Sequence, residues 1–237
     1  MSLLRTDYGE AWAYESIVGA LPGVDLSEPQ AVAFQFVLFE VLILLLAWVY
    51  DLWNAAIAGT AAVAVAVVGS VAMLRLGAGT RSLDLPETYR RVLFGSSIEV
   101  VLAVLAFIAL VTHLFVFDPQ QAAAVGRPPL LEQLFGPDPP VVVVYLMLLV
   151  LWDLCYRIGT SWWTAVVALW RSYRYRFDDE TVGALRRLDA TNVGFALAQM
   201  LLVPFLLDEP VLLFAVGGHV VAVTVVSTAA LVTLREA

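Results

Sequence analysis

An acid and a base stand four residues apart in an apolar part of the chain, at Asp153 and Arg157. In a helix this spacing puts both side chains on one face. A charged group inside a membrane is costly unless it is paired or used for function. The pair is therefore either a structural ion pair that fixes the position of a helix, or part of a path for protons or ions. Both interpretations stay open.

Four further titratable side chains fall within long apolar stretches, where each is a candidate for function. Glu40 is either a functional group or a protonated carboxyl that is hydrogen-bonded to a neighbouring helix. Glu99 and His113 are 14 residues apart, close to a whole number of helical turns. They therefore share a face, on which they either line a proton or cation path or lie solvated at opposite membrane surfaces. His219 follows two glycines, which let a neighbouring helix come close.

The chain has no motif of a catalytic, metal or cofactor site. A catalytic zinc site needs about three protein ligands, and neither an HExxH pattern nor a paired-carboxylate signature is found. Cys155 is the only cysteine, which excludes a disulfide within the chain and a CxxC metal site. We expect no catalytic residue, no metal and no cofactor, and we favour a protein that is not an enzyme.

The composition is that of an integral membrane protein. The 237 residues are 61% hydrophobic and 14% charged, against about 45–50% and 25% in soluble domains. This excludes an ordinary soluble enzyme, a disordered chain and a nucleic-acid binder. All 13 basic residues are arginine, and there are 21 acidic residues. Such a composition is typical of a halophilic archaeon, in which acidic loops stay hydrated in strong salt, or of a GC-rich bacterial genome.

Six stretches are long enough to span a membrane, which takes about 20 apolar residues. In front of them lies an N-terminal segment, residues 1–30, in which Trp12 and Tyr14 suggest a helix at the membrane interface. A proline-rich connector over 118–140 forms either a lid on the outer surface or a re-entrant piece. The predicted spans cover about residues 31–50, 54–76, 96–117, 141–160, 191–207 and 211–234.

The fourth stretch is ambiguous, because residues 141–176 stay apolar or aromatic for 36 positions. They form either one span to about residue 160 with an interfacial helix over 161–176, or two short spans that break near Gly159. One span puts the arginine-rich loops on one side of the membrane and leaves only Arg127 on the other. This asymmetry is typical of cytoplasmic loops. We predict six spans in the cell membrane, with both termini in the cytoplasm.

An internal similarity supports the alternative of seven spans. Two arginines, Arg90-Arg91, precede the third span, as Arg186-Arg187 precede the next to last. Asp118-Pro119 and Asp208-Glu209-Pro210 follow these two spans. The chain would then consist of two three-helix repeats and a final helix, an arrangement known from transporters.

Small residues recur at every fourth position of the second predicted span. Such a face lets another helix approach closely, either within the fold or in a homo-oligomer. The other expected partners are membrane lipids and small ions. The basic and aromatic segment 170–176 suits lipid headgroups rather than nucleic acid. The small residues are Ala58, Ala62, Ala66 and Ser70.

Together these observations predict a small channel or transporter that moves protons or small cations by means of intramembrane carboxylates. Two other functions stay open. A non-catalytic membrane subunit or sensor fits the small-residue face and the acidic N-terminal segment. An intramembrane lipid-modifying enzyme needs an acid–base cluster at one depth, and the candidate residues are scattered along the chain.

Overall fold

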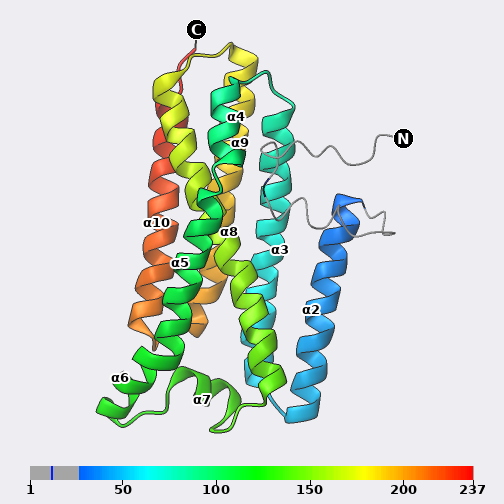
Figure 1. The fold of residues 1–237 in the computed structure, drawn as a ribbon, viewed down its shortest axis with the longest axis vertical. Coiled ribbons are helices and arrows are strands. Elements are labelled where there is room, and N and C mark those ends of the chain that lie inside the picture. The colour runs from blue at the N-terminus through cyan, green and yellow to red at the C-terminus, as the bar shows by residue number, and fades with distance from the viewer. Residues whose placement is uncertain (1–11, 13–26, 237) are drawn as a thin grey trace.

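The computed structural model describes residues 12 and 27–236, which fold into a bundle of long helices (Figure 1). Six helical stretches are long and apolar enough to cross a membrane. This confirms the predicted all-α membrane fold and the count of six spans. In chain order the elements are α2 (Glu28–Tyr50), α3 (Trp53–Arg81), α4 (Glu87–Gly95), α5 (Ile98–Thr112), the π-helical turn η1 (His113–Phe117), α6 (Asp118–Val125), α7 (Leu130–Phe135), α8 (Val141–Arg174), α9 (Asp179–Ala198), the 3₁₀ helix η2 (Gln199–Phe205) and α10 (Pro210–Thr233).

The ambiguous fourth stretch is a single helix, α8, which runs without a break from Val141 to Arg174. At 1.5 Å per residue its 34 residues extend about 51 Å, beyond the roughly 30 Å hydrocarbon core of a bilayer. Neither a break near Gly159 nor a separate interfacial helix is present. Gly159 is instead a contact point, since a Cβ atom there would lie 2.9 Å from the backbone nitrogen of Ala103 on α5.

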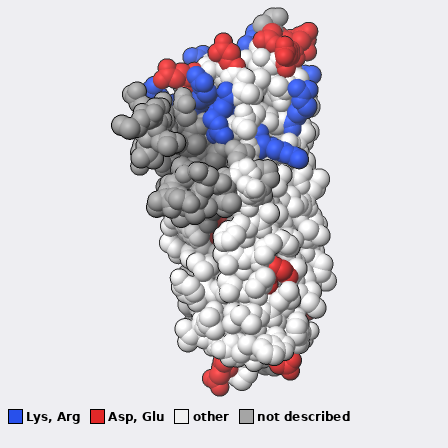
Figure 2. Space-filling model, turned by 90° about the vertical axis from the view of Figure 1, so that its right-hand side faces the viewer, with Lys and Arg blue, Asp and Glu red and all other residues white. Residues whose placement is uncertain are grey.

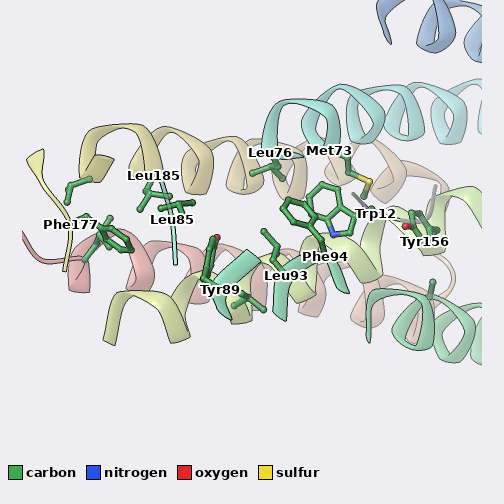
Figure 3. Close-up of a cluster of buried hydrophobic side chains, with 14 residues drawn as sticks. Trp12, Met73, Leu76, Leu85, Tyr89, Leu93, Phe94, Tyr156, Phe177 and Leu185 are labelled. Atoms are coloured by element: carbon green, nitrogen blue, oxygen red, sulfur yellow. The ribbon is translucent and has the colours of Figure 1, made fainter. Parts of the chain in front are cut away.

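At the end of the bundle where α3 and α8 finish, which we call the arginine-rich end, α4 packs with α3, α8 and α9 around a hydrophobic core (Figure 3). Trp12 belongs to this core. It is 1% exposed, and its ring meets Phe94 edge-on at a centroid distance of 5.0 Å. The N-terminal segment thus supplies a core side chain, while Tyr14, also predicted to lie in an interfacial helix, falls outside the described residues.

Charged residues are concentrated at the ends of the bundle. Figure 2 shows arginines and acids at the upper end of the face that it displays, above a largely uncharged middle. Arg174 and Arg235 are exposed at the arginine-rich end, where α8 and α10 finish. Arg127 lies at the opposite end, between α6 and α7. The uncharged middle is the part that suits a bilayer.

The opposite end, which we call the connector end, is closed by α6 and α7, which lie across the bundle (Figure 1). These two short helices take up most of the predicted proline-rich connector. Asp51 makes the tight turn between α2 and α3 with a left-handed backbone, φ 56°, which aspartate adopts more readily than most residues. Pro204 lies within η2, where its missing N–H cannot support a regular helix.

Helix α2 lies at the edge of the bundle, packs mainly on α3 and touches α8 only slightly. The small residues of α3 serve contacts within this one chain: Ala62, Ala66 and Ser70 are buried. Gly59 lies against Ile43 of α2, because a Cβ atom there would come 3.2 Å from Cδ1 of that side chain. Three of the four small residues are therefore buried inside the fold, and Ala58 is half-buried. A contact between copies through this face stays a prediction.

Candidate functional site

Asp153 and Arg157 form a two-pronged ion pair on α8. Arg157 donates from Nη2 to Oδ1 of Asp153 at 2.7 Å and from Nε to Oδ2 at 3.0 Å. Each residue is 3% exposed, so both charges are enclosed by the protein. A bidentate contact of this kind is the strong form of an arginine–carboxylate pair.

Two further residues, which sequence reasoning did not assign to this site, extend the pair into a network. Gln35 of α2 donates from Nε2 to Oδ2 of Asp153 at 3.0 Å. Its Oε1 accepts from Oγ of Ser70 and from Nη2 of Arg157, both at 3.5 Å. Helices α2, α3 and α8 therefore meet at one polar point, which we call the Gln35 network. Glutamine carries no charge and belongs to no motif here. Only its position within an apolar stretch could have indicated that Gln35 is part of a polar site.

The Gln35 network lies deep in the bundle. Asp153 comes 12 residues after the start of α8, or about 18 Å along the helix, near the middle of a hydrocarbon core of about 30 Å. Gly69 of α3 makes room for the network, because a Cβ atom there would lie 2.6 Å from Cδ of Arg157. Since acid and base cancel, the network places polar groups but no net charge in the membrane.

A cavity of about 410 Å³, which we call the chamber, lies between the helices at the connector end. Its walls come from α2, α3, α5, η1, α8, η2 and α10, and α7 covers it with Leu130 and Leu134. On the α3 side, Ala58 and Gly59 leave the space open because they have almost no side chain. Among the lining residues only Gln133 has a polar side chain. Sequence reasoning did not anticipate this cavity.

The chamber and the Gln35 network adjoin. Val150 of α8 lines the chamber and also a small pocket beside Gln35 and Asp153. Leu154, the neighbour of Asp153 along the chain, lines the chamber as well. The network therefore marks the inner end of the chamber, and the site combines an apolar space with a polar end.

The other two predicted carboxylates lie elsewhere. Glu40 of α2 accepts a hydrogen bond from Oγ1 of Thr60 at 2.9 Å, which matches a carboxyl bonded to a neighbouring helix. Glu99 is 1% exposed at the start of α5 and is not solvated. One oxygen of each, Oε2, is buried without a hydrogen-bond partner among the described residues.

The two histidines occupy different helices. His113 is 8% exposed and begins the π-helical turn η1, where its ring lies 5.6 Å from that of Phe117. His219 is half-buried on α10, and its Nε2 has no partner in the described part of the chain. Within residues 12 and 27–236, no group of three or more His, Cys, Asp or Glu side chains could hold a metal ion.

A family model covers nearly the whole chain. The family of unknown function DUF7530 matches residues 7–230, from the N-terminal segment into α10. The chain belongs to this family. No curated protein and no solved structure matches it. The DUF7530 match includes the whole Gln35 network and every residue that lines the chamber.

In this DUF7530 chain a second ion cluster, which sequence reasoning missed, ties the connector to α10. Arg127 donates to Asp118 Oδ1 and to Glu209 Oε1, both at 2.7 Å. The backbone N–H of Leu130 donates to the other oxygen of Asp118 at 2.6 Å. The hydrogen bond to Glu209, with the charges of both acids, holds the pKa of the Arg127 guanidinium above its ordinary value. The cluster anchors the start of α7, the cover of the chamber.

A third cluster lies at the arginine-rich end of the DUF7530 fold. Arg171 of α8 is 1% exposed and donates to Asp189 Oδ2 of α9 at 2.6 Å. It also donates to the hydroxyl of Tyr89 of α4 at 3.2 Å. The three helices are thereby locked together by a buried charge pair. All three side chains are enclosed by protein.

Proposed function

We propose that this protein binds the hydrocarbon chain of a membrane lipid in the chamber. The observation that carries the proposal is the lining, in which Gln133 alone is polar. The volume of about 410 Å³ falls within the roughly 300–1,000 Å³ of small-molecule sites. An apolar cavity of roughly 150 Å³ already holds benzene, so the chamber has room for a hydrocarbon segment more than twice as large.

Water and ions are unfavourable occupants of such a space. A buried water needs about two to four polar partners, and an ion needs groups that replace its hydration shell. The amide nitrogen of Gln133 is already engaged, because it donates to the carbonyl of Pro128 at 2.8 Å. Hydrocarbon chains of the bilayer, in contrast, surround the exposed apolar faces of α2 and α5 and lose no hydrogen bond on entering.

The two ends of the chamber support binding rather than free passage. At the connector end, α7 is fixed over the chamber by the contacts of Asp118 with Leu130 and Arg127. At the inner end, the side chains of the Gln35 network satisfy one another. A chain that enters therefore meets a fixed cover on one side and a paired polar cluster on the other.

Filling the chamber is expected to expel the chain. In Ala58→Trp, the indole would occupy the chamber, because Ala58 lines it. The matched control is Ile57→Trp on the same turn of α3, where the side chain is 61% exposed and faces outward. A phospholipid with a photoreactive diazirine in its chain would be crosslinked in proteoliposomes, and labelled peptides would be read by mass spectrometry.

We expect labelling of the α8 segment around Met147, which lines the chamber, in the wild type and the control, and strongly reduced labelling in Ala58→Trp. Equal labelling in all three proteins would show that lipid touches only the outer surface. This result would refute the proposal.

Proton or small-cation transport is a second candidate function, and the position of Glu40 favours it. Glu40 lies five residues after Gln35 on α2, about 7.5 Å along the helix. One of its oxygens is buried with no partner among the described residues. Two carboxylates, Glu40 and Asp153, thus lie at mid-membrane depth beside α2, which is only loosely packed on α8.

Transport predicts a flux that depends on these carboxylates. Ion and proton flux would be measured in proteoliposomes at high salt for the wild type and Glu40→Gln, with Glu132→Gln on the exposed surface of α7 as the control. If the protein transports ions, the wild type and the Glu132→Gln control show flux. The flux of Glu40→Gln falls to the level of empty liposomes. Absence of flux from folded protein would remove this candidate and leave lipid binding unaffected.

The arrangement of arginines supports a cytoplasmic position for the arginine-rich end. The loops that carry most of the arginines adjoin this end, and the connector end carries Arg127. Cytoplasmic loops of membrane proteins are enriched in arginine and lysine. We therefore propose a multi-pass protein of the cell membrane with the chamber in the outer half of the bilayer and both termini in the cytoplasm.

A further inference from the structure

A second cavity, at the arginine-rich end, has the opposite character to the chamber. Its volume is about 160 Å³, and its lining combines positive charge with hydroxyl groups. We propose that this cavity, here called the arginine pocket, binds a phosphate group. The lining residues are Ser172, Tyr173, Arg174, Tyr175, Arg176 and Arg235.

The backbone holds two of these arginines side by side. Phe177 and Glu236 form a parallel β-bridge, so the residues that precede them, Arg176 and Arg235, occupy neighbouring positions. Like charges at facing positions of paired strands are destabilising. No ion pair or hydrogen bond joins either guanidinium to another side chain in the described part of the chain. An anion between them would remove the repulsion.

The neighbouring acids do not serve as this anion. Asp178 is turned toward the start of α9, where its carboxylate accepts from the backbone N–H and the hydroxyl of Thr181 at 2.9 and 3.1 Å. The N–H bond lowers the pKa of Asp178, which keeps this carboxylate charged and engaged at the helix start. Glu236 is exposed and does not line the pocket. The positive charge of the pocket is therefore available to a ligand.

The chemistry of the lining favours phosphate over other anions. Guanidinium groups bind phosphate oxygens with two parallel N–H donors, and the phenol of Tyr173, which is 71% exposed, can add a further donor. The cavity has room for about five waters at roughly 30 Å³ each. This space suits one or two phosphate groups rather than a large organic ligand.

The place of the pocket along the bundle favours a soluble source of the phosphate. The pocket lies at the end of α8, about 51 Å along the helix from Val141. A whole bilayer with its headgroups is only about 40–45 Å thick. A dissolved phosphate compound reaches this position freely, whereas a lipid headgroup must extend away from its own layer.

Pyrophosphate would be titrated into the detergent-purified protein by calorimetry at constant chloride concentration. We expect binding by the wild type, and at least a roughly tenfold weaker affinity for Arg176→Gln and for Arg235→Gln, since each loses a charged hydrogen bond. The matched control is Arg186→Gln, an exposed arginine of α9 at the same end that does not line the pocket. Its affinity is expected to equal that of the wild type.

The source of the phosphate is tested with the same protein in nanodiscs. If the pocket takes lipid headgroups, discs that contain phosphatidic acid weaken pyrophosphate binding relative to discs of phosphatidylcholine alone. If the source is soluble, the two discs give the same affinity. Absence of binding by the wild type, or an equal loss in Arg186→Gln, would show that there is no phosphate site and only a diffuse positive charge.

Discussion

Asp153→Asn is expected to destabilise the protein by about 3–5 kcal/mol, the cost of removing one partner of a buried ion pair. The variant leaves the Arg157 guanidinium, which is 3% exposed, without its carboxylate. An arginine does not lose its proton in a protein, so the charge stays in the middle of the bundle. The new amide offers one acceptor oxygen instead of two, so Gln35 and Arg157 compete for it. The measurement is the unfolding midpoint in detergent, together with the free energy from denaturant titration.

The double variant Asp153→Asn with Arg157→Gln is the decisive comparison. It removes both charges, and with them the cost of a buried guanidinium that has lost its carboxylate. We expect it to recover most of the stability that the single variant loses. If the double variant is no more stable than Asp153→Asn, the contribution of Asp153 to stability does not come from its pairing with Arg157. The Gln35 network would then not stabilise the packing of α2, α3 and α8 through this ion pair.

The spans could be predicted because a lipid-facing helix must be apolar over a fixed length. The partners of those helices could not be predicted in the same way. A helix that is apolar all round, such as α2, gives no sign of which face meets protein. The contact of Gln35 with Asp153 joins residues 118 positions apart, and that of Arg127 with Glu209 joins residues 82 apart. Only the three-dimensional packing reveals these pairs.

The candidate site shows the same division between local and distant information. The spacing of Asp153 and Arg157 is local, so their pairing could be proposed from sequence, and the structure brings them together. The chamber depends on residues from eight elements. An alanine or glycine on α3 has the same sequence signal whether it packs against a helix or forms the wall of a cavity. The sequence likewise predicts that Trp12 lies at the membrane interface, although this side chain packs in a protein core at the arginine-rich end.

Gly159→Ala tests a close contact between α5 and α8. The new Cβ atom would lie 2.9 Å from the nitrogen of Ala103 and 3.1 Å from the carbonyl oxygen of Glu99. Both are backbone atoms, so the clash is relieved only if one helix moves away from the other. Overpacking of this kind typically costs about 1–3 kcal/mol, and we expect Gly159→Leu to exceed that range and to lower the yield of folded protein.

The matched control is Gly194→Ala, four residues before the end of α9 at Ala198. A Cβ atom there would meet nothing within 4 Å. Alanine favours a helix over glycine by roughly 0.5–1 kcal/mol, so this variant is expected to be neutral or slightly more stable. The same gain in helix stability opposes the clash at position 159. A net loss of stability in Gly159→Ala therefore reports on the packing of α5 against α8. If Gly159→Ala were as stable as Gly194→Ala, α5 and α8 could separate at no cost. Tight packing of α5 against α8 would then not be what holds α8, and with it the Gln35 network, in place beside the chamber.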